Sequence, residues 1–117
     1  MKVKFVGLCA ALLVSHPGTS VARYLTGNDL QELCASSEVG CMSYIMGVVG
    51  GVQTNDALVN RSSENRTAAL RLCIPAGVSA TQLVDIVKKS IDGQPETRHQ
   101  DAAFLTVLAI TRAFPCK

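Results

Sequence analysis

The cysteines and histidines are the residues of this 117-residue sequence best suited to catalysis or metal binding. A cysteine–histidine hydrolase needs a free thiolate close to an imidazole. A zinc site usually contains cysteine or histidine pairs at short, regular spacings. The sequence has five cysteines and two histidines but no C-x-x-C pair. Whether either chemistry is available depends on which of these residues remain in the processed chain.

Residues 1–22 have the pattern of a secretory signal peptide. Lys2 and Lys4 form a basic start, Phe5 to Val14 is an apolar run, and Ser20-Val21-Ala22 is a small-residue cleavage site. We predict cleavage after Ala22. An N-terminal membrane anchor is the rival interpretation, but the apolar run is shorter than the ~20 residues that a span needs. We therefore expect an exported protein with no membrane span in its mature form.

Cleavage would leave His99 and four cysteines: Cys34, Cys41, Cys73 and Cys116. An even number of cysteines in a short exported chain predicts two disulfides, for which three connectivities are possible. With every thiol paired, a cysteine nucleophile beside His99 is not expected. One histidine without a C-x-x-C pair is a weak basis for zinc binding. We therefore predict a protein that is not an enzyme, without catalytic residues, metal or cofactor.

The charge balance also excludes a class of partner. Of 11 Lys and Arg residues, Lys2 and Lys4 belong to the predicted signal peptide, which leaves nine against nine Asp and Glu residues. A nucleic-acid-binding domain usually presents a strongly basic face. Aromatic residues, which stack on bases, make up only 4% of the chain. We therefore expect no nucleic acid partner.

The central element is predicted to be a helix around Cys41–Val52. Its apolar residues recur at helical spacing, at Cys41, Ile45, Val48 and Val52, with Met42 and Val49 alongside. Gly47 and Gly51 lie four residues apart, so we expect a second helix to approach the backbone there. Glycines and valines form helices poorly. This helix should therefore persist only when other elements bury it.

A short helix is predicted before it, with Thr26 as its cap and Asp29 in its first turn. It should end near Cys34, so that Cys34 and Cys41 flank a tight turn between two helices. After Gln53 the chain becomes polar as far as Asn65. We expect the central helix to end around Leu58 to Asn60 and the polar stretch to form an exposed loop.

The third helix has the strongest local signals. Ser79 and Gln82 form a capping box, and Gly93 should end the helix in a left-handed conformation. The residues expected to face the core are Leu83, Ile86, Val87 and Ile91, with Val84 at the edge. The residues expected to face water are Gln82, Asp85, Lys88 and Lys89.

The last helix should include Pro95 in its first turn. The stretch Ala102–Ala113 is apolar nearly all round, with Ala103, Val107, Ile110 and Phe114 as one spine. Such a helix must be buried on more than one side, which a second subunit could supply.

A short turn between the last two helices should make them antiparallel. Cys73, before the third helix, would then lie beside Cys116, after the fourth. We therefore favour the pairs Cys34–Cys41 and Cys73–Cys116, the second worth ~4 kcal/mol on the chain-entropy model. The predicted fold class is all-α, a small bundle of about four helices stapled by two disulfides, with residues 23–117 as one domain.

Four groups of residues, in this order and spacing, resemble the Rap/Tai family of immunity proteins. The groups are Tyr24–Leu30 with Leu33-Cys34; Cys41, Tyr44, Ile45 and Gly47; Leu72–Pro75 with Gln82–Val84; and Pro95, Glu96, Arg98, His99, Ala102, Ala103 and Ala113–Cys116. This family protects bacteria against amidase effectors of type VI secretion. The resemblance implies an all-helical periplasmic protein, often a homodimer. It also implies binding to a peptidoglycan amidase effector and occlusion of the effector's active-site cleft.

Contacts with the amidase effector are expected from two exposed polar segments, which lie mostly outside the four groups of residues that carry the resemblance. One consists of Asn60, Arg61, Ser62, Ser63, Glu64, Asn65 and Arg66. The other, which we favour, consists of Asp92, Gly93, Gln94 and Glu96, because two rigid helices would hold it with little ordering cost. The apolar last helix and the helix containing Gly47 and Gly51 are the candidate dimer surface.

Two other functions are compatible with a chain of this kind. A small periplasmic acid-stress chaperone or another binding protein would share the size, helices and disulfides. A single histidine in a balanced charge set gives no special pH switch, which places the chaperone second. An enzyme ranks third, because it needs a free cysteine.

Overall fold

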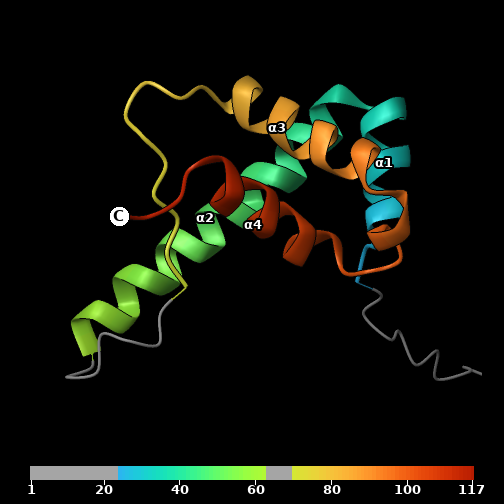
Figure 1. The fold of residues 1–117 in the computed structure, drawn as a ribbon. Helices are drawn as coiled ribbons and strands as arrows, with labels where there is room; N and C mark the ends of the chain where they lie inside the picture. Colours follow the sequence, from blue (N-terminus) through green and yellow to red (C-terminus); the bar gives the residue numbers. More distant parts are fainter. Residues whose placement is uncertain (1–23, 63–69) are drawn as a thin grey trace, which may run out of the picture.

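The computed structural model describes residues 24–62 and 70–117, which form an all-α protein (Figure 1). Its elements are α1 (Gly27–Ser36), α2 (Glu38–Ser62), α3 (Ala80–Gly93), the short 3-10 helix η1 (Pro95–Thr97) and α4 (Ala102–Ala113). This confirms the predicted fold class. The predicted signal peptide and its cleavage site lie outside the described residues.

The α1–α2 corner forms as its sequence predicts. The Thr26 hydroxyl accepts a hydrogen bond from the Asp29 amide at 3.3 Å, and the Asp29 carboxylate accepts one from the Thr26 amide at 2.8 Å. This reciprocal capping box fixes the start of α1. Only one residue separates α1 from α2, and the Cys34–Cys41 disulfide joins the two helices across the corner with a Cα–Cα distance of 4.6 Å.

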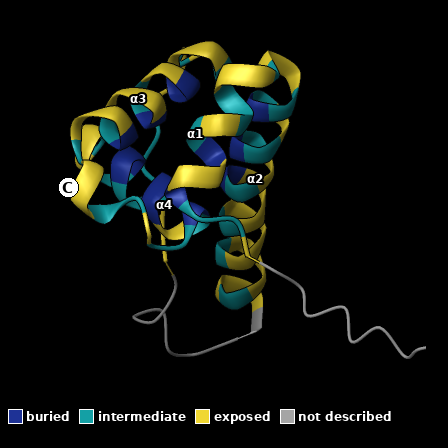
Figure 2. Ribbon diagram, turned by 90° about the vertical axis from the view of Figure 1, so that its right-hand side faces the viewer, coloured by how far each residue is buried: buried dark blue, intermediate teal, exposed yellow. Residues whose placement is uncertain are grey.

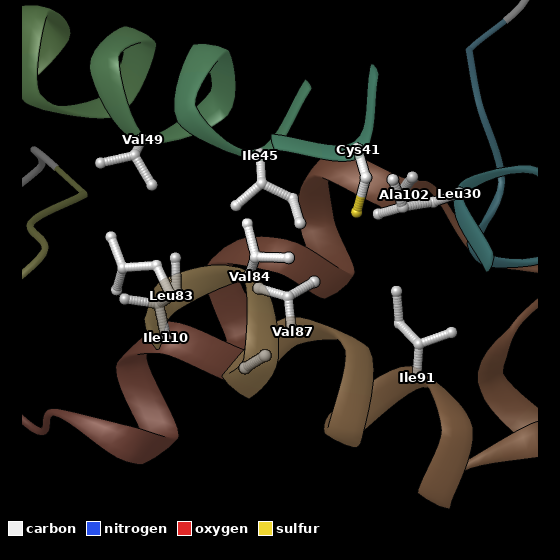
Figure 3. Packing of buried hydrophobic residues seen from close by; sticks show 11 residues of the cluster. Leu30, Cys41, Ile45, Val49, Leu83, Val84, Val87, Ile91, Ala102 and Ile110 are labelled. Carbon is white, nitrogen blue, oxygen red and sulfur yellow. The ribbon is translucent and has the colours of Figure 1, made fainter. Parts of the chain in front are cut away.

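The core lies where α2 and α4 pack against α3 (Figure 3). Cys41, Ile45 and Val49 recur every four residues along α2 and point toward the apolar side chains of α3. The buried residues of α3 are Leu83, Val84, Val87 and Ile91. The predicted face is therefore slightly wrong: Val84 lies in the core, whereas Ile86 is half-buried.

The predicted spine of α4 is confirmed at Ile110, which is buried, and only in part at Phe114, which packs against the edge of the core. The helix buries Ala102, Leu105, Thr106, Ala109 and Ile110. Ala103, Val107 and Phe114 are only half-buried. An all-round apolar sequence does not specify which face turns inward, so packing against α3 and α1 decides it. The buried Thr106 is satisfied because its hydroxyl donates to the Ala102 carbonyl at 2.7 Å.

The end of α3 also differs from the prediction. Gly93 is the last residue of α3 and is not left-handed; Gly77, in the connector before α3, has a φ of +90°. Pro95 does not begin α4 but the separate 3-10 helix η1. Arg98 explains why no left-handed glycine is needed. Its guanidinium donates to the carbonyls of the last turn of α3, from Nε to Ile91 at 2.8 Å and from Nη2 to Asp92 at 2.9 Å.

The start of α1 is bonded to the segment that joins α3 to α4. The Gly27 amide donates to the Gln100 carbonyl at 2.9 Å, and the Asn28 amide donates to the Arg98 carbonyl at 2.9 Å. The Ala102 amide in turn donates to the Leu25 carbonyl at 2.7 Å. These backbone bonds connect the first described segment of the chain to the last helix.

The second half of α2 projects beyond the other described helices (Figures 1 and 2). No described residue of α2 after Val49 is buried. The helix end predicted around Leu58 to Asn60 is slightly too early, since α2 continues to Ser62, and the described polar residues after Gln53 are helical and not a loop. The expected close approach at Gly47 and Gly51 is also wrong, since a Cβ at either position would meet no described atom within 4 Å.

The segment before α3, described from Leu70, packs against the core and is tied to the C-terminus. Cys73 and Cys116 form the second disulfide, with a Cα–Cα distance of 5.2 Å. Both predicted pairs are thus confirmed. The connector turns at Gly77, where the Val78 amide lies 3.4 Å from the Pro75 carbonyl.

Candidate functional site

The favoured contact segment lies at the turn from α3 into η1. Asp92, Gly93 and Glu96 are exposed and Gln94 is half-buried. Two of these side chains are tied to other helices. The Asp92 carboxylate accepts a hydrogen bond from Gln31 Nε2 at 2.7 Å. The Gln94 side-chain oxygen lies 3.4 Å from Arg112 Nη1. The turn is therefore held in one conformation by α1, by α4 and by the Arg98 cap.

The other predicted segment is only partly described. Asn60 and Arg61 are exposed residues in the last turn of α2, and Asn60 Nδ2 donates to the Asp56 carboxylate at 3.0 Å. Ser62 is the last residue of the helix. Ser63, Glu64, Asn65 and Arg66 lie outside the described residues. The part that the structure describes is thus a helix end and not the loop that was predicted.

The structure does not bring these two segments together. The end of α2 and the end of α3 lie at opposite sides of the molecule (Figure 1). One narrow cleft in a partner could therefore receive one of them, but not both from the same copy of the chain.

A third surface is the apolar hollow between α2 and α4, which has a volume of about 410 Å³. Its lining residues are Val48, Gly51, Val52, Leu70, Ala103, Phe104 and Val107. Phe104 is 56% exposed, which is unusual for a phenylalanine on a helix that also builds the core. The hollow includes residues of both helices that were predicted to form a dimer surface.

The described residues offer little that could act in catalysis. His99 is exposed, and all four described cysteines are in disulfides. Among residues 24–62 and 70–117, no group of three or more histidines, cysteines and acidic residues could hold a metal ion. Within the same residues, no helix combines the length and apolarity that crossing a membrane requires.

Tyr44 is a titratable group of the described residues with a displaced pKa. Partial burial of the phenol raises its pKa above the ordinary value of 10.0, and the negative charge of Asp101 raises it further. A phenol with a raised pKa stays protonated at neutral pH.

Arg98 at the α3–η1 turn and Phe104 in the hollow between α2 and α4 were not singled out by the sequence. Arg98 was noted only within a family-like group, although an arginine shortly after a helix end is a possible cap for the helix carbonyls. Phe104 gave no signal of exposure, because it lies in a helix that is apolar nearly all round.

Comparison with protein families gives a match that spans the whole described fold. The model of the Rap1a immunity proteins matches residues 26–116, from the cap of α1 to the last cysteine. The family resemblance seen in the sequence is thereby confirmed. No curated protein and no solved structure matches the chain.

Proposed function

Because this chain belongs to the Rap1a immunity protein family, we propose that it protects its producer from a peptidoglycan amidase effector of type VI secretion. The family match over residues 26–116 is the observation that carries this proposal. Immunity proteins of this kind act by binding a secreted effector. The cell-wall amidase as the target comes from the resemblance of the four residue groups described above.

The periplasm is the compartment in which such protection would be required. Two disulfides tie the described fold together, and disulfides persist in oxidising compartments such as the periplasm. The proposed signal peptide, residues 1–22, would deliver the chain there. An effector that cuts peptide stems of the cell wall would be intercepted in the same space.

Inhibition would be steric: the protein makes and breaks no covalent bond and fills the cleft of the amidase. The α3–η1 turn is suited to this role because it is already ordered. Its carbonyls are capped by Arg98, and Asp92 and Gln94 are held by Gln31 and Arg112. An ordered segment loses little conformational entropy on binding, so more of its contact energy appears as affinity.

Glu96 is a second exposed charged group at this turn, after Asp92. It lies in η1, directly after Pro95, and faces solvent. The projecting end of α2, with Asn60 and Arg61, is the second proposed contact. Since the two segments lie far apart, it would touch a different part of the effector or a second effector molecule.

A homodimer would bury the hollow between α2 and α4. Apolar surface in contact with water costs about 25 cal/mol per Å², so covering Phe104 and its neighbours favours association. The open backbone at Gly51 would allow another helix to approach closely.

Sedimentation of the oxidised protein tests the proposed homodimer. Only monomer at high concentration would contradict it, and Phe104→Glu should dissociate a dimer if one forms.

Protection of growing cells tests the proposed function. Each type VI amidase effector encoded in the same genome would be exported to the periplasm of a sensitive strain. The full-length chain should restore growth against one of them, and a chain lacking residues 2–22 should not. Lysis by every effector in the presence of the full-length chain would contradict the proposal.

The contact at the α3–η1 turn needs its own variant. Asp92→Ala/Gln94→Ala/Glu96→Ala should lose protection while melting close to the wild-type temperature. If this triple variant bound the effector as tightly as wild type, the turn would be ruled out as the blocking element. The end of α2 would then be the next segment to vary, through Asn60→Ala/Arg61→Ala.

A further inference from the structure

A hollow of the described surface lies between α1 and α3. It has a volume of about 540 Å³ and adjoins a second hollow of about 280 Å³ at the α1–α2 corner. The two hollows share Cys34, Ala35 and Lys88. We call this continuous depression the α1–α3 groove. Neither the family match nor the predicted contact residues assign it a role, although Asp92 lies at one end of it.

The groove combines an apolar floor with an acidic border. Its floor includes Ile91, Ala35 and the Cys34–Cys41 disulfide. The charged residues that line it are Glu32, Glu38, Asp85, Asp92 and Lys88. Four carboxylates and one ammonium give a formal charge of −3, in a chain whose predicted mature form is balanced.

Acidic side chains lie mainly on one side of α3 and basic side chains on the other. On the opposite side of α3, the hollow next to α4 is lined by Lys89 and Arg112. All five charged groups of the α1–α3 groove are exposed, and of these five only Asp92 has a side-chain hydrogen bond to another described residue. Glu32, Glu38 and Asp85 are therefore available for a partner.

We propose that the α1–α3 groove binds a basic segment of the effector, in which arginine or lysine residues alternate with apolar ones. The stems of such side chains can lie on Ile91 and the disulfide while their charged ends reach the carboxylates. This inference rests on the proposed function, because the occupant is a part of the effector. The effector surface bound by the groove would adjoin the surface bound by the α3–η1 turn, because Asp92 belongs to both.

The sign of the charge effect tests the proposal. Complementary charges around an interface act mainly on the association rate and on its salt dependence. Glu32→Lys/Asp85→Lys should slow association with the inhibited effector about 10-fold at low salt and flatten the salt dependence. Lys88→Glu makes the groove more negative and should speed association instead.

The control is Ser43→Lys, which adds a positive charge to the exposed surface of α2 outside the groove and should alter the rate less than twofold. Surface plasmon resonance with a catalytically inactive effector measures all four proteins, and circular dichroism confirms that each is folded. Association of Glu32→Lys/Asp85→Lys at the wild-type rate, or slower association of Lys88→Glu, would overturn the proposal.

A second experiment examines the groove without any effector. Acetyl-Arg-Leu-Arg-amide, titrated into the ¹⁵N-labelled wild-type protein, should shift amide resonances of residues 28–35 and 81–92. The same peptide with glutamate in place of arginine should not. An unchanged spectrum, or shifts on the Lys89 side of α3, would contradict the groove assignment.

The two experiments separate the groove from the function on which it rests. If the arginine peptide shifts the groove but no amidase effector binds, the proposed function fails and the groove stands as a site for basic segments. If an effector binds while the charge variants and the peptide have no effect, the groove assignment fails and the function stands.

Discussion

Replacing Gly27 by alanine should destabilise the fold through a clash at the start of α1. A Cβ atom at Gly27 would lie 2.6 Å from Leu105 Cδ1, and 3.0 Å from both the Cα and the carbonyl oxygen of Arg98. The Leu105 methyl can rotate away. The Arg98 backbone cannot move freely, because its carbonyl accepts the Asn28 amide and its side chain caps α3.

The expected cost follows from these contacts. Adding a methyl group to a closely packed site costs roughly 1–3 kcal/mol. Displacing the Gly27–Gln100 and Asn28–Arg98 hydrogen bonds weakens each, and an intact one contributes about 1 kcal/mol. Alanine's better helix propensity returns at most ~1 kcal/mol. The net loss should be about 2 kcal/mol, which lowers the melting temperature of a domain this size by roughly 8–16 °C.

Gly50→Ala is the matched control, because it makes the same change where the space is open. Gly50 is exposed in the interior of α2, and a Cβ there would meet nothing within 4 Å. Alanine should stabilise this position by ~0.5–1 kcal/mol. Thermal unfolding of the oxidised proteins, followed by circular dichroism, compares the two. A Gly27→Ala variant as stable as wild type, or shifts of the same sign in both variants, would refute the reasoning.

Three further predictions concern stability. Arg98→Ala removes two charge-assisted hydrogen bonds to the end of α3 and should lower the free energy of unfolding in urea by about 2 kcal/mol. The stability of Arg98→Lys should lie between those of wild type and Arg98→Ala. Equal stability of all three proteins would show that the cap is unimportant. Removing the Cys73–Cys116 pair should cost about 4 kcal/mol, more than removing the other pair, because its separation is 43 residues against 7; the reverse order would contradict the chain-entropy argument. Burial, and then the charge of Asp101, raise the Tyr44 pKa, so the folded state holds this proton more tightly than the unfolded chain. The resulting stability is present below pH 10 and falls as the pH rises through the Tyr44 pKa. Absorbance titration of the Tyr24→Phe variant, in which Tyr44 is the remaining tyrosine, should give a midpoint above 10. A midpoint below that value would refute the prediction of a raised Tyr44 pKa.

The parts of the fold that sequence reasoning located correctly depend on neighbouring residues. Thr26 with Asp29, and Ser79 with Gln82, mark the helix starts because a cap acts within one turn. The disulfide pairs followed once the helix order was known, since each pair lies where two elements must meet.

The errors arise where tertiary contacts decide. The sequence of α4 is apolar nearly all round, so nothing local distinguishes buried Leu105 from exposed Phe104. The polar residues after Gln53 suit an exposed loop and an exposed helix equally well. Gly93 was assigned a left-handed stop, but the carbonyls it would have satisfied are capped by Arg98, seven residues after Ile91.

The candidate site shows the same division. Polarity and position between two helices were sufficient to identify Asp92–Glu96 as an exposed turn. The bond from Gln31, 61 residues earlier in the chain, was not predictable, and neither was the acidic groove that it borders. Both depend on the packing of α1 beside α3, which no local pattern encodes.

Inhibition of an amidase effector tests the central claim most directly. The purified, oxidised protein lacking residues 1–22 would be mixed with each candidate effector at increasing molar ratio, and cleavage of peptidoglycan stem peptides would be followed. We expect one effector to lose its activity completely near an equimolar ratio. Full activity of every effector in the presence of excess protein would contradict the immunity function and leave the helical, disulfide-linked fold without an assigned partner.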